Sequence, residues 1–350
     1  MNSNPLLLML CLLSVLVAVT GPFGVSRAES FDDSQIRHID YPAWFEENPF
    51  FDLAEELEKA RAEQKQGLMV LFTTEGCSYC DAFIRTSLGD SSIASTVQQN
   101  FVSVGLEIFD DTGMTDPHGI ALPVKKFAER EGVEFSPTLL FYGADGGRVL
   151  RVAGYQSPER FRIILDYLSS GYFRTGSLRD YVKSIAGKGS ASKSDTGLVD
   201  DPLFSKPPYA LDRRIAASQP LLVIFEKNGC KECSQFHKTV LARNEVRDML
   251  KQFEIVRFDV DDDETVIVTP DGSRATPASW FKATDFTALP ALVFFDERGN
   301  EVLKTDALVL PQRMTNSILY VLERAYDKGW TYQRFARSKG IEKQLGKQAE

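Results

Sequence analysis

The stretch that decides the fold is residues 75–80, with the sequence EGCSYC, which directly follows the apolar run LMVLF at 68–72. A β-rich run that leads into two cysteines three apart predicts a buried strand that ends where a helix begins. The free N–H groups and the positive dipole end of a helix stabilise a thiolate in its first turn, here that of Cys77. Cys80, one turn further on, is then placed to resolve a mixed disulfide by bonding to Cys77.

The same pattern occurs a second time in the chain. The apolar run LLVIF at 221–225 leads into NGCKEC at 228–233, and the offset of 153 residues that separates Cys77 from Cys230 holds without a gap far beyond the cysteines. By this offset Phe72, Phe83, Pro137, Pro158 and Tyr167 fall on Phe225, Phe236, Pro290, Pro311 and Tyr320. A repeat this long indicates two copies of one domain.

The composition is that of a globular protein. A length of 350 residues suggests two to three domains. The apolar share of 43% is sufficient for packed cores and excludes a disordered chain. The formal net charge of −9 argues against a nucleic-acid partner.

The N-terminus has the features of a signal peptide. Residues 6–19 form an apolar segment of 14 residues, which is short for a membrane span but has the length of a signal-peptide core. Ser26-Arg27-Ala28 provides a small-x-small cleavage site. We therefore expect residues 1–28 to be removed and the protein to be periplasmic. The alternative is an uncleaved segment that anchors the protein in the membrane, facing the periplasm.

Cleavage leaves four cysteines, and all of them belong to the two CxxC pairs. A secreted chain of this length with no other cysteine has no structural disulfide framework, so the pairs are expected to be reactive. We predict no metal site, because a zinc ion held by both pairs would have to join two separate domains. Binding of Cu(I) by a single CxxC pair is the alternative. His118 and His237 are interpreted as surface or capping residues.

Changes of composition divide the chain into five parts. We expect a first domain at 29–182, a Gly-, Ser- and Pro-rich flexible linker at 183–208, a second domain at 209–335 and a polar tail at 336–350, all after the signal peptide. Within the first domain, residues 110–123 are rich in Asp, Gly and Pro and are predicted to form a loop.

The order strand, CxxC at a helix start, strand, helix, X-Pro, hairpin, helix resembles the thioredoxin superfamily, twice over. The resemblance implies an α/β fold with two tandem thioredoxin-like domains, each a central mixed sheet flanked by helices. Within the superfamily the chain is most similar to the SoxW-like periplasmic thioredoxin-related proteins. The resemblance also implies that Pro137 and Pro290 are cis and lie against the CxxC pairs. Ser136 and Leu289, which precede them, would offer their backbone to an incoming peptide.

The chain departs from thioredoxin proper at three positions. Thioredoxin has Trp before the first cysteine, Gly-Pro between the cysteines and a buried Asp six residues upstream. These positions hold Gly76, Ser78-Tyr79 and Leu71 in the first copy, and Gly229, Lys231-Glu232 and Ile224 in the second. Because the buried Asp is replaced, the proton acceptor that helps activate the resolving cysteine of thioredoxin is missing.

These observations predict thiol–disulfide exchange with protein or small-thiol substrates, with an electron relay between the domains as a variant. Cys77 and Cys230 would attack and Cys80 and Cys233 would resolve. No flavin or nicotinamide signature is present, so we predict no cofactor and expect a membrane thiol transporter to supply reducing power. The competing classes are a Cu(I) carrier and a redox-inert adaptor. The residues expected to position the substrate are Ser136, Pro137, Leu289, Pro290 and Tyr79.

Overall fold

The computed structural model describes residues 31–46, 51–186 and 200–349. The predicted signal peptide, residues 1–28, lies outside the described residues and stays a prediction. Among the helices of the described segments, none is both long and apolar enough to cross a membrane. Residues Phe31–Glu350 form one compact unit that contains both repeats.

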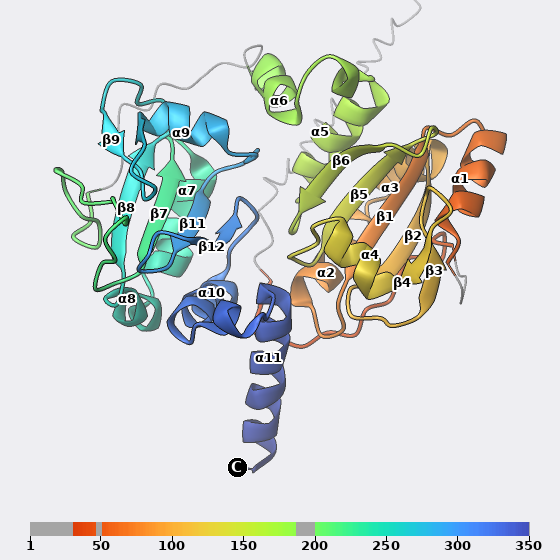
Figure 1. Cartoon of the computed structure of the whole chain (residues 1–350). Coiled ribbons are helices and arrows are strands. Elements are labelled where there is room, and N and C mark those ends of the chain that lie inside the picture. Colours follow the sequence, from red (N-terminus) through yellow and green to blue (C-terminus); the bar gives the residue numbers. More distant parts are fainter. Residues whose placement is uncertain (1–30, 47–50, 187–199, 350) are drawn as a thin grey trace, which may run out of the picture. The chain divides into compact units, whose positions relative to one another are not determined.

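The first repeat is built on a mixed four-stranded sheet with the strand order β2-β1-β5-β6 (Figure 1). The central strand β1 runs parallel to β2 and antiparallel to β5, and β5 pairs antiparallel with β6. The strands are β1 (Gly67–Thr73), β2 (Phe101–Glu107), β5 (Thr138–Gly143) and β6 (Arg148–Ala153). The helices are α1 (Leu53–Ala62), α2 (Ser78–Ala82), α3 (Ser91–Asn100), α4 (Val124–Arg130), α5 (Pro158–Ser169) and α6 (Leu178–Ala186).

Helices cover both faces of this sheet, which is why β1 is apolar without alternation. All seven residues of β1 are buried. Met69 and Leu71 pack in one cluster with side chains of α3 and α5, whereas Leu68, Val70 and Phe72 pack in another with side chains of α1 and α4. The strand that leads into the first CxxC pair therefore runs through the centre of a double-sided core.

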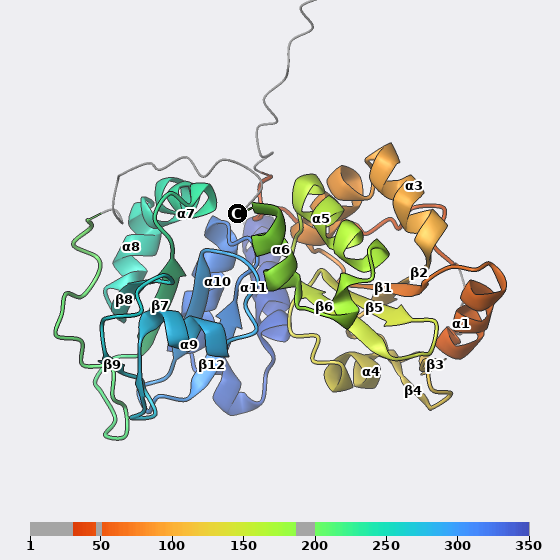
Figure 2. The same cartoon turned by 90° about the horizontal axis from the view of Figure 1, so that it is seen from above.

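The second repeat has the same architecture, with the strand order β12-β11-β7-β8 (Figure 1; seen from above in Figure 2). Its last sheet-covering helix, α10, begins at Pro311 as α5 begins at Pro158, and a proline is well tolerated in the first turn of a helix. The strands are β7 (Leu221–Glu226), β8 (Glu254–Asp259), β11 (Ala291–Phe295) and β12 (Glu301–Thr305). The helices are α7 (Lys231–Phe236), α8 (Asn244–Leu250), α9 (Pro277–Ala283), α10 (Pro311–Leu322) and α11 (Tyr332–Ala349). The predicted pair of tandem α/β domains is confirmed.

The expected linker and the expected end of the second domain differ in detail from the structure. The linker at 183–208 begins inside α6 and ends beyond Phe204, whose ring belongs to the core of the second repeat, and residues 187–199 lie outside the described part of the chain. The boundary at residue 335 falls inside α11, whose first turn is buried through Tyr332 and Phe335. Polar composition alone does not reveal these apolar anchors.

The predicted loop at 110–123 contains a two-stranded hairpin, so that prediction was incomplete. Its strands are β3 (Gly113–Thr115) and β4 (Ala121–Pro123). The buried carboxylate of Asp116 accepts hydrogen bonds from the backbone N–H groups of His118 and Ile120, both at 2.8 Å, and pairs with Arg130 at 2.6 Å. Asp116, which contributes to the Asp-rich composition that predicted a loop, thus stabilises the turn between two short strands.

Gly67 provides a test of how β1 enters the sheet. Its φ is +152°, and a Cβ placed on it would lie 1.9 Å from the carbonyl oxygen of Tyr142. Gly67→Ala is therefore expected to lower the free energy of unfolding by about 2 kcal/mol or more. Gly113→Ala is the control, because nothing lies within 4 Å of a Cβ at that position. Denaturant unfolding of the full chain measures both, and equal stability of the two variants would contradict the argument.

Candidate functional site

Each CxxC pair lies at the start of a helix, as predicted. Cys77 is the N-cap of α2, and its Sγ accepts a hydrogen bond from the backbone N–H of Cys80 at 3.1 Å. Cys230 caps α7 in the same way, with 3.0 Å from its Sγ to the backbone nitrogen of Cys233. Both pairs form disulfides, each with a Cα–Cα distance of 5.3 Å. A thiolate released at either N-cap would keep this backbone donor and the positive end of the helix.

The two sulfurs of each pair differ in accessibility. Cys77 and Cys230 are half-buried, whereas Cys80 and Cys233 are 0% and 4% exposed. A thiolate from solution therefore reaches the first cysteine of a pair, and the second cysteine is the leaving group. The predicted roles, attack by the first cysteine of each pair and resolution by the second, stay a prediction.

A cis proline accompanies each pair. The Ser136–Pro137 and Leu289–Pro290 bonds are both cis, so this prediction is confirmed. The Ser136 hydroxyl lies 3.5 Å from the Sγ of Cys77 and is placed to donate a hydrogen bond to it. Leu289, at the same position in the second repeat, has no such donor. Because a hydrogen bond to a charged sulfur favours the thiolate, the two sites differ in chemistry.

The backbone of Ser136 is already bonded to the second repeat. Its N–H donates to Oε1 of Gln333 at 3.2 Å, and its carbonyl oxygen accepts from Nη2 of Arg313 at 2.9 Å. Ser136 is 0% exposed. Leu289 is half-buried, and among the described residues its backbone makes no hydrogen bond. Of the two residues expected to offer their backbone to a peptide, Ser136 already has both backbone groups hydrogen-bonded, and Leu289 does not.

Tyr79 contacts the second repeat. Its hydroxyl donates to Oδ2 of Asp33 at 2.9 Å and accepts from the backbone N–H of Leu310 at 2.9 Å. The guanidinium of Arg313 lies over its ring, 3.5 Å from the ring centroid. With 5% of its surface exposed, Tyr79 takes part in the contact between the repeats, and its expected role in positioning a substrate stays a prediction.

Asp33 joins the N-terminal segment to this contact. Its carboxylate accepts hydrogen bonds from the backbone N–H groups of Gln312 at 3.1 Å and Arg313 at 2.8 Å. These groups belong to the first turn of α10, whose own N-cap residue, Leu310, provides no capping side chain. A carboxylate from a distant part of the chain thus satisfies the free donors of the helix and interacts favourably with its dipole.

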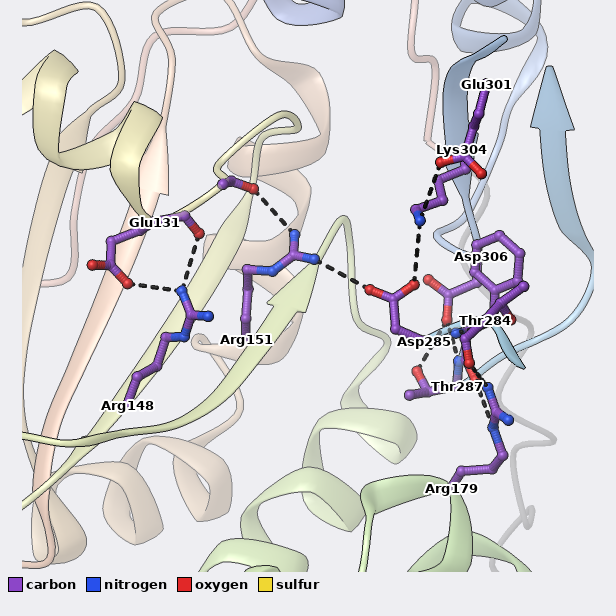
Figure 3. Close-up of polar contacts among 12 residues, drawn as sticks. Glu131, Arg148, Arg151, Arg179, Thr284, Asp285, Thr287, Glu301, Lys304 and Asp306 are labelled. Carbon is purple, nitrogen blue, oxygen red and sulfur yellow. Dashed lines mark hydrogen bonds and ion pairs between the residues drawn. The ribbon is translucent and has the colours of Figure 1, made fainter. Parts of the chain in front are cut away.

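The loop before Leu289–Pro290 is held by the first repeat and by its own repeat (Figure 3). Arg179 of α6 donates to the carbonyl oxygens of Phe286 and, at 2.9 Å, of Thr284. Arg151 pairs with Asp285 at 3.4 Å. Within the second repeat, Asp306 accepts from the backbone N–H of Thr287 at 2.6 Å and of Ala288 at 3.0 Å. These bonds order the loop and leave Leu289 itself without one.

The contacts between the repeats are reciprocal. Arg160 of α5 and Arg313 of α10 occupy the same position at the offset of 153 residues. Arg160 donates to Oγ1 of Thr287 at 2.8 Å, as Arg313 donates to Ser136. Each arginine therefore reaches the proline loop of the other repeat. The sequence interpretation missed both arginines, although their matching positions were visible in the repeat.

Glu226, which lies four residues before Cys230, has a buried carboxylate with two partners. His237 Nε2 is 2.7 Å from Oε1 of Glu226, which is 2% exposed at the end of β7, and Arg257 Nε is 3.9 Å from the other carboxylate oxygen. The expectation that His237 is a surface or capping residue was wrong, because Glu226 gives it a buried partner. Among the described residues, no three His, Cys, Asp or Glu side chains cluster in a way suited to a metal ion.

The buried phenol of Tyr79 makes the stability of the protein depend on pH in the alkaline range. Burial raises the pKa of Tyr79 well above its ordinary 10.0, and the charge of Arg313 offsets part of the effect. Tyr79→Phe leaves the Leu310 N–H without its partner and is expected to cost about 1–3 kcal/mol at neutral pH. As the pH rises, the phenol loses its proton at a lower pH in the unfolded chain than in the folded one. The contribution of Tyr79 to the free energy of unfolding is therefore complete below pH 10 and falls above it.

The measurement is the free energy of unfolding of the wild type and Tyr79→Phe between pH 8 and 12. The difference between the two proteins should shrink by about 1.4 kcal/mol per pH unit above pH 10. The other tyrosines titrate in both proteins and cancel. Parallel curves through pH 12 would show that the phenol is not buried.

Comparisons with known proteins agree with the fold. The family model described as a thioredoxin-like domain matches the chain twice, at residues 53–169 and 208–322. A search of the curated proteins found no match.

Three solved structures are similar to parts of the chain. A thioredoxin-fold protein from Helicobacter pylori is 18% identical, with a TM-score of 0.33, over 42% of this chain and 94% of its own. A thioredoxin from Thermus thermophilus is 25% identical, with a TM-score of 0.27, over 34% and 85%. A disulphide isomerase from Xylella fastidiosa Temecula1 is 13% identical, with a TM-score of 0.20, over 39% and 87%.

The family assignment rests on the family model, whose two matches cover most of the described residues and agree with the boundaries of the two sheets. The resemblance to the SoxW-like proteins stays a prediction. With a CxxC disulfide at a helix start beside a cis proline in each half, the chain is a thiol–disulfide oxidoreductase that belongs to the family of thioredoxin-like domains.

Proposed function

We propose that the protein is exported and exchanges disulfides with protein or small-thiol substrates through both CxxC pairs. The observation that carries this proposal is the same in each repeat: a half-buried cysteine at the helix N-cap is disulfide-bonded to a buried cysteine one turn further on. A purely structural disulfide needs no accessible sulfur and no N-cap position. Both features serve a sulfur that is attacked from outside and leaves or attacks as a thiolate.

In the reducing direction the Cys77 thiolate attacks a substrate disulfide, forms a mixed disulfide and releases one substrate thiolate. The Cys80 thiolate then attacks the Sγ of Cys77, re-forms the Cys77–Cys80 bond and releases the second substrate thiolate. Two electrons pass from the dithiol to the substrate, and the two protons of the dithiol are released or taken up by the substrate thiolates. Cys230 and Cys233 perform the same steps in the second repeat.

An electron relay between the repeats is part of the proposal. It is supported by the chemical difference between the pairs: Cys77 has the Ser136 hydroxyl at 3.5 Å, whereas Cys230 is followed by exposed Lys231 and Glu232. A difference in potential gives electrons a direction of flow.

Export and an external reductant complete the proposal. They are supported by the apolar segment at 6–19 and by the absence of cysteines outside the two pairs in residues 29–350. A membrane thiol transporter would reduce the pairs after each cycle, because the chain has no flavin or nicotinamide signature.

The experiment removes one resolving cysteine at a time. Reduced Cys80→Ser and Cys233→Ser proteins are incubated with glutathione disulfide, and adducts are mapped by mass spectrometry. A stable mixed disulfide is expected on Cys77 in the first variant and on Cys230 in the second, because the step that releases the bound glutathione is blocked. A Cys77–Cys230 disulfide in either variant, formed without added glutathione disulfide, is the result expected of a relay.

The matched controls are Cys77→Ser and Cys230→Ser, which retain only the buried cysteine of a pair. These controls should form adducts at least about tenfold more slowly, since their remaining thiol is shielded from the substrate. Equal adduct formation on the buried cysteines would reverse the assigned roles. No adduct in any variant would refute the exchange reaction.

A further inference from the structure

The backbone of Ser136 is the natural place for a polypeptide substrate to bind beside Cys77. Ser136 lies two residues before β5, and its hydroxyl is 3.5 Å from the Cys77 sulfur. Extended peptides commonly bind by pairing their backbone with a free N–H and C=O next to a strand. Here the carboxamide of Gln333 accepts from the Ser136 N–H, and the guanidinium of Arg313 donates to the Ser136 carbonyl. Two side chains of the second repeat thus make the two bonds that a peptide would make.

These two side chains are fixed by their surroundings. Arg313 is 5% exposed, lies over the Tyr79 ring at 3.5 Å and also donates to the carbonyl oxygen of Leu308 at 3.3 Å. Carbonyl acceptors and an aromatic face compensate a buried guanidinium for its lost hydration. Gln333 is 8% exposed and follows Tyr332, whose ring lies 5.0 Å from that of Phe135. The pair of side chains, which we call the Ser136 cap, is therefore part of a packed contact.

The second site lacks this cap. Arg160, the counterpart of Arg313, bonds to the Thr287 hydroxyl and not to the Leu289 backbone. Asp180, the counterpart of Gln333, accepts at 2.6 Å from the hydroxyl of Ser177, the residue just before its own helix. Leu289 is half-buried and, in the described part of the chain, its backbone groups are unbonded. The repeat-equivalent residues thus cap one site and leave the other open.

A small molecule can still approach Cys77. Cys77 lines an open pocket of about 750 Å³ between the N-terminal segment, the CxxC turn and α11. This volume is in the range of small-molecule sites. Asp32 and Glu75 line it on one side and Arg337 and Lys343 on the other, so it presents both signs of charge. A thiol of tripeptide size that carries both amino and carboxylate groups matches the pocket in size and charge.

We propose that the Ser136 cap restricts the Cys77–Cys80 pair to low-molecular-weight thiols and disulfides, while the Cys230–Cys233 pair accepts polypeptides. The inference rests on the proposed function and assigns a substrate class to each site. A small thiolate attacks the Cys77 sulfur, forms an S–S bond with it and displaces Cys80 as a thiolate. A second small thiolate attacks the sulfur of the small thiol that is bonded to Cys77. The bond to Cys77 breaks, the small disulfide leaves and Cys77 is released as a thiolate. Two small thiols are oxidised and one protein disulfide is reduced.

The test compares two full-length proteins that each keep one pair, Cys230→Ser/Cys233→Ser and Cys77→Ser/Cys80→Ser. Each reduced protein reacts with glutathione disulfide and, separately, with insulin, and the ratio of the insulin rate to the glutathione disulfide rate is recorded. The ratio should be at least about tenfold lower for the protein that keeps Cys77–Cys80, the scale set by two backbone hydrogen bonds. This comparison needs no change in the cap itself.

Variants of the cap, made in the protein that keeps Cys77–Cys80, give the second arm. Gln333→Leu removes the acceptor for the Ser136 N–H and should raise the ratio at least about threefold. Arg313→Met/Gln333→Leu should raise it about tenfold. Gln333→Glu keeps an acceptor and should leave the ratio low. Arg151→Ala is the control for a general loosening of the repeats, because it removes the exposed pair with Asp285 and does not touch Ser136.

The outcomes separate the two proposals. If neither one-pair protein reacts with either substrate, the exchange function fails. If both react but share the same ratio, exchange stands and the restriction by the cap is refuted. If Arg151→Ala raises the ratio as much as Gln333→Leu does, separation of the repeats and not the Ser136 cap controls access, which also overturns the inference.

Discussion

The arrangement of the first site depends on the contacts of one buried group, the guanidinium of Arg313. It bonds to the carbonyl oxygen of Ser136, lies over the Tyr79 ring and belongs to a helix whose first turn is capped by Asp33. A buried charge is tolerated only where acceptors and aromatic faces surround it, so each of these groups is constrained by the others. The CxxC turn, the cis-proline loop and the N-terminal segment are thereby tied to the second repeat.

The duplication explains how such a contact arises. In a two-fold symmetric dimer of identical domains, one surface patch contacts its own copy, and residue i meets residue j in both directions. Arg160 and Arg313 still follow that rule across the fused repeats, and Gly154 meets Ala307, its own counterpart at the offset of 153 residues. Fusion allows the two halves to diverge independently. The change from Asp180 to Gln333 at matching positions is such a divergence, and it makes the two sites chemically different.

The sequence was sufficient for the features that depend on local order. The apolar run before Cys77, the helix start and the repeat follow from residues that are close in sequence or related by the constant offset, whereas the cis prolines were implied by the resemblance to the thioredoxin superfamily. The partners of Ser136 and Tyr79 did not follow, because Gln333 is 197 residues from Ser136 and Leu310 is 231 residues from Tyr79. Nothing in a tyrosine between two cysteines indicates whether its hydroxyl meets a substrate or a buried carboxylate. The hairpin at 110–123 was missed because Asp116 stabilises a turn in place of a solvated loop.

The central claim is that both disulfides are redox couples with different environments. A redox titration of the protein against glutathione and dithiothreitol tests it most directly, with each pair followed separately by differential alkylation and mass spectrometry. The account predicts two distinct two-electron transitions, in the range of about −270 to −120 mV that thioredoxin-fold couples span. Two coincident transitions would contradict the difference between the sites, and a protein in which neither pair exchanges would contradict the assigned chemistry itself.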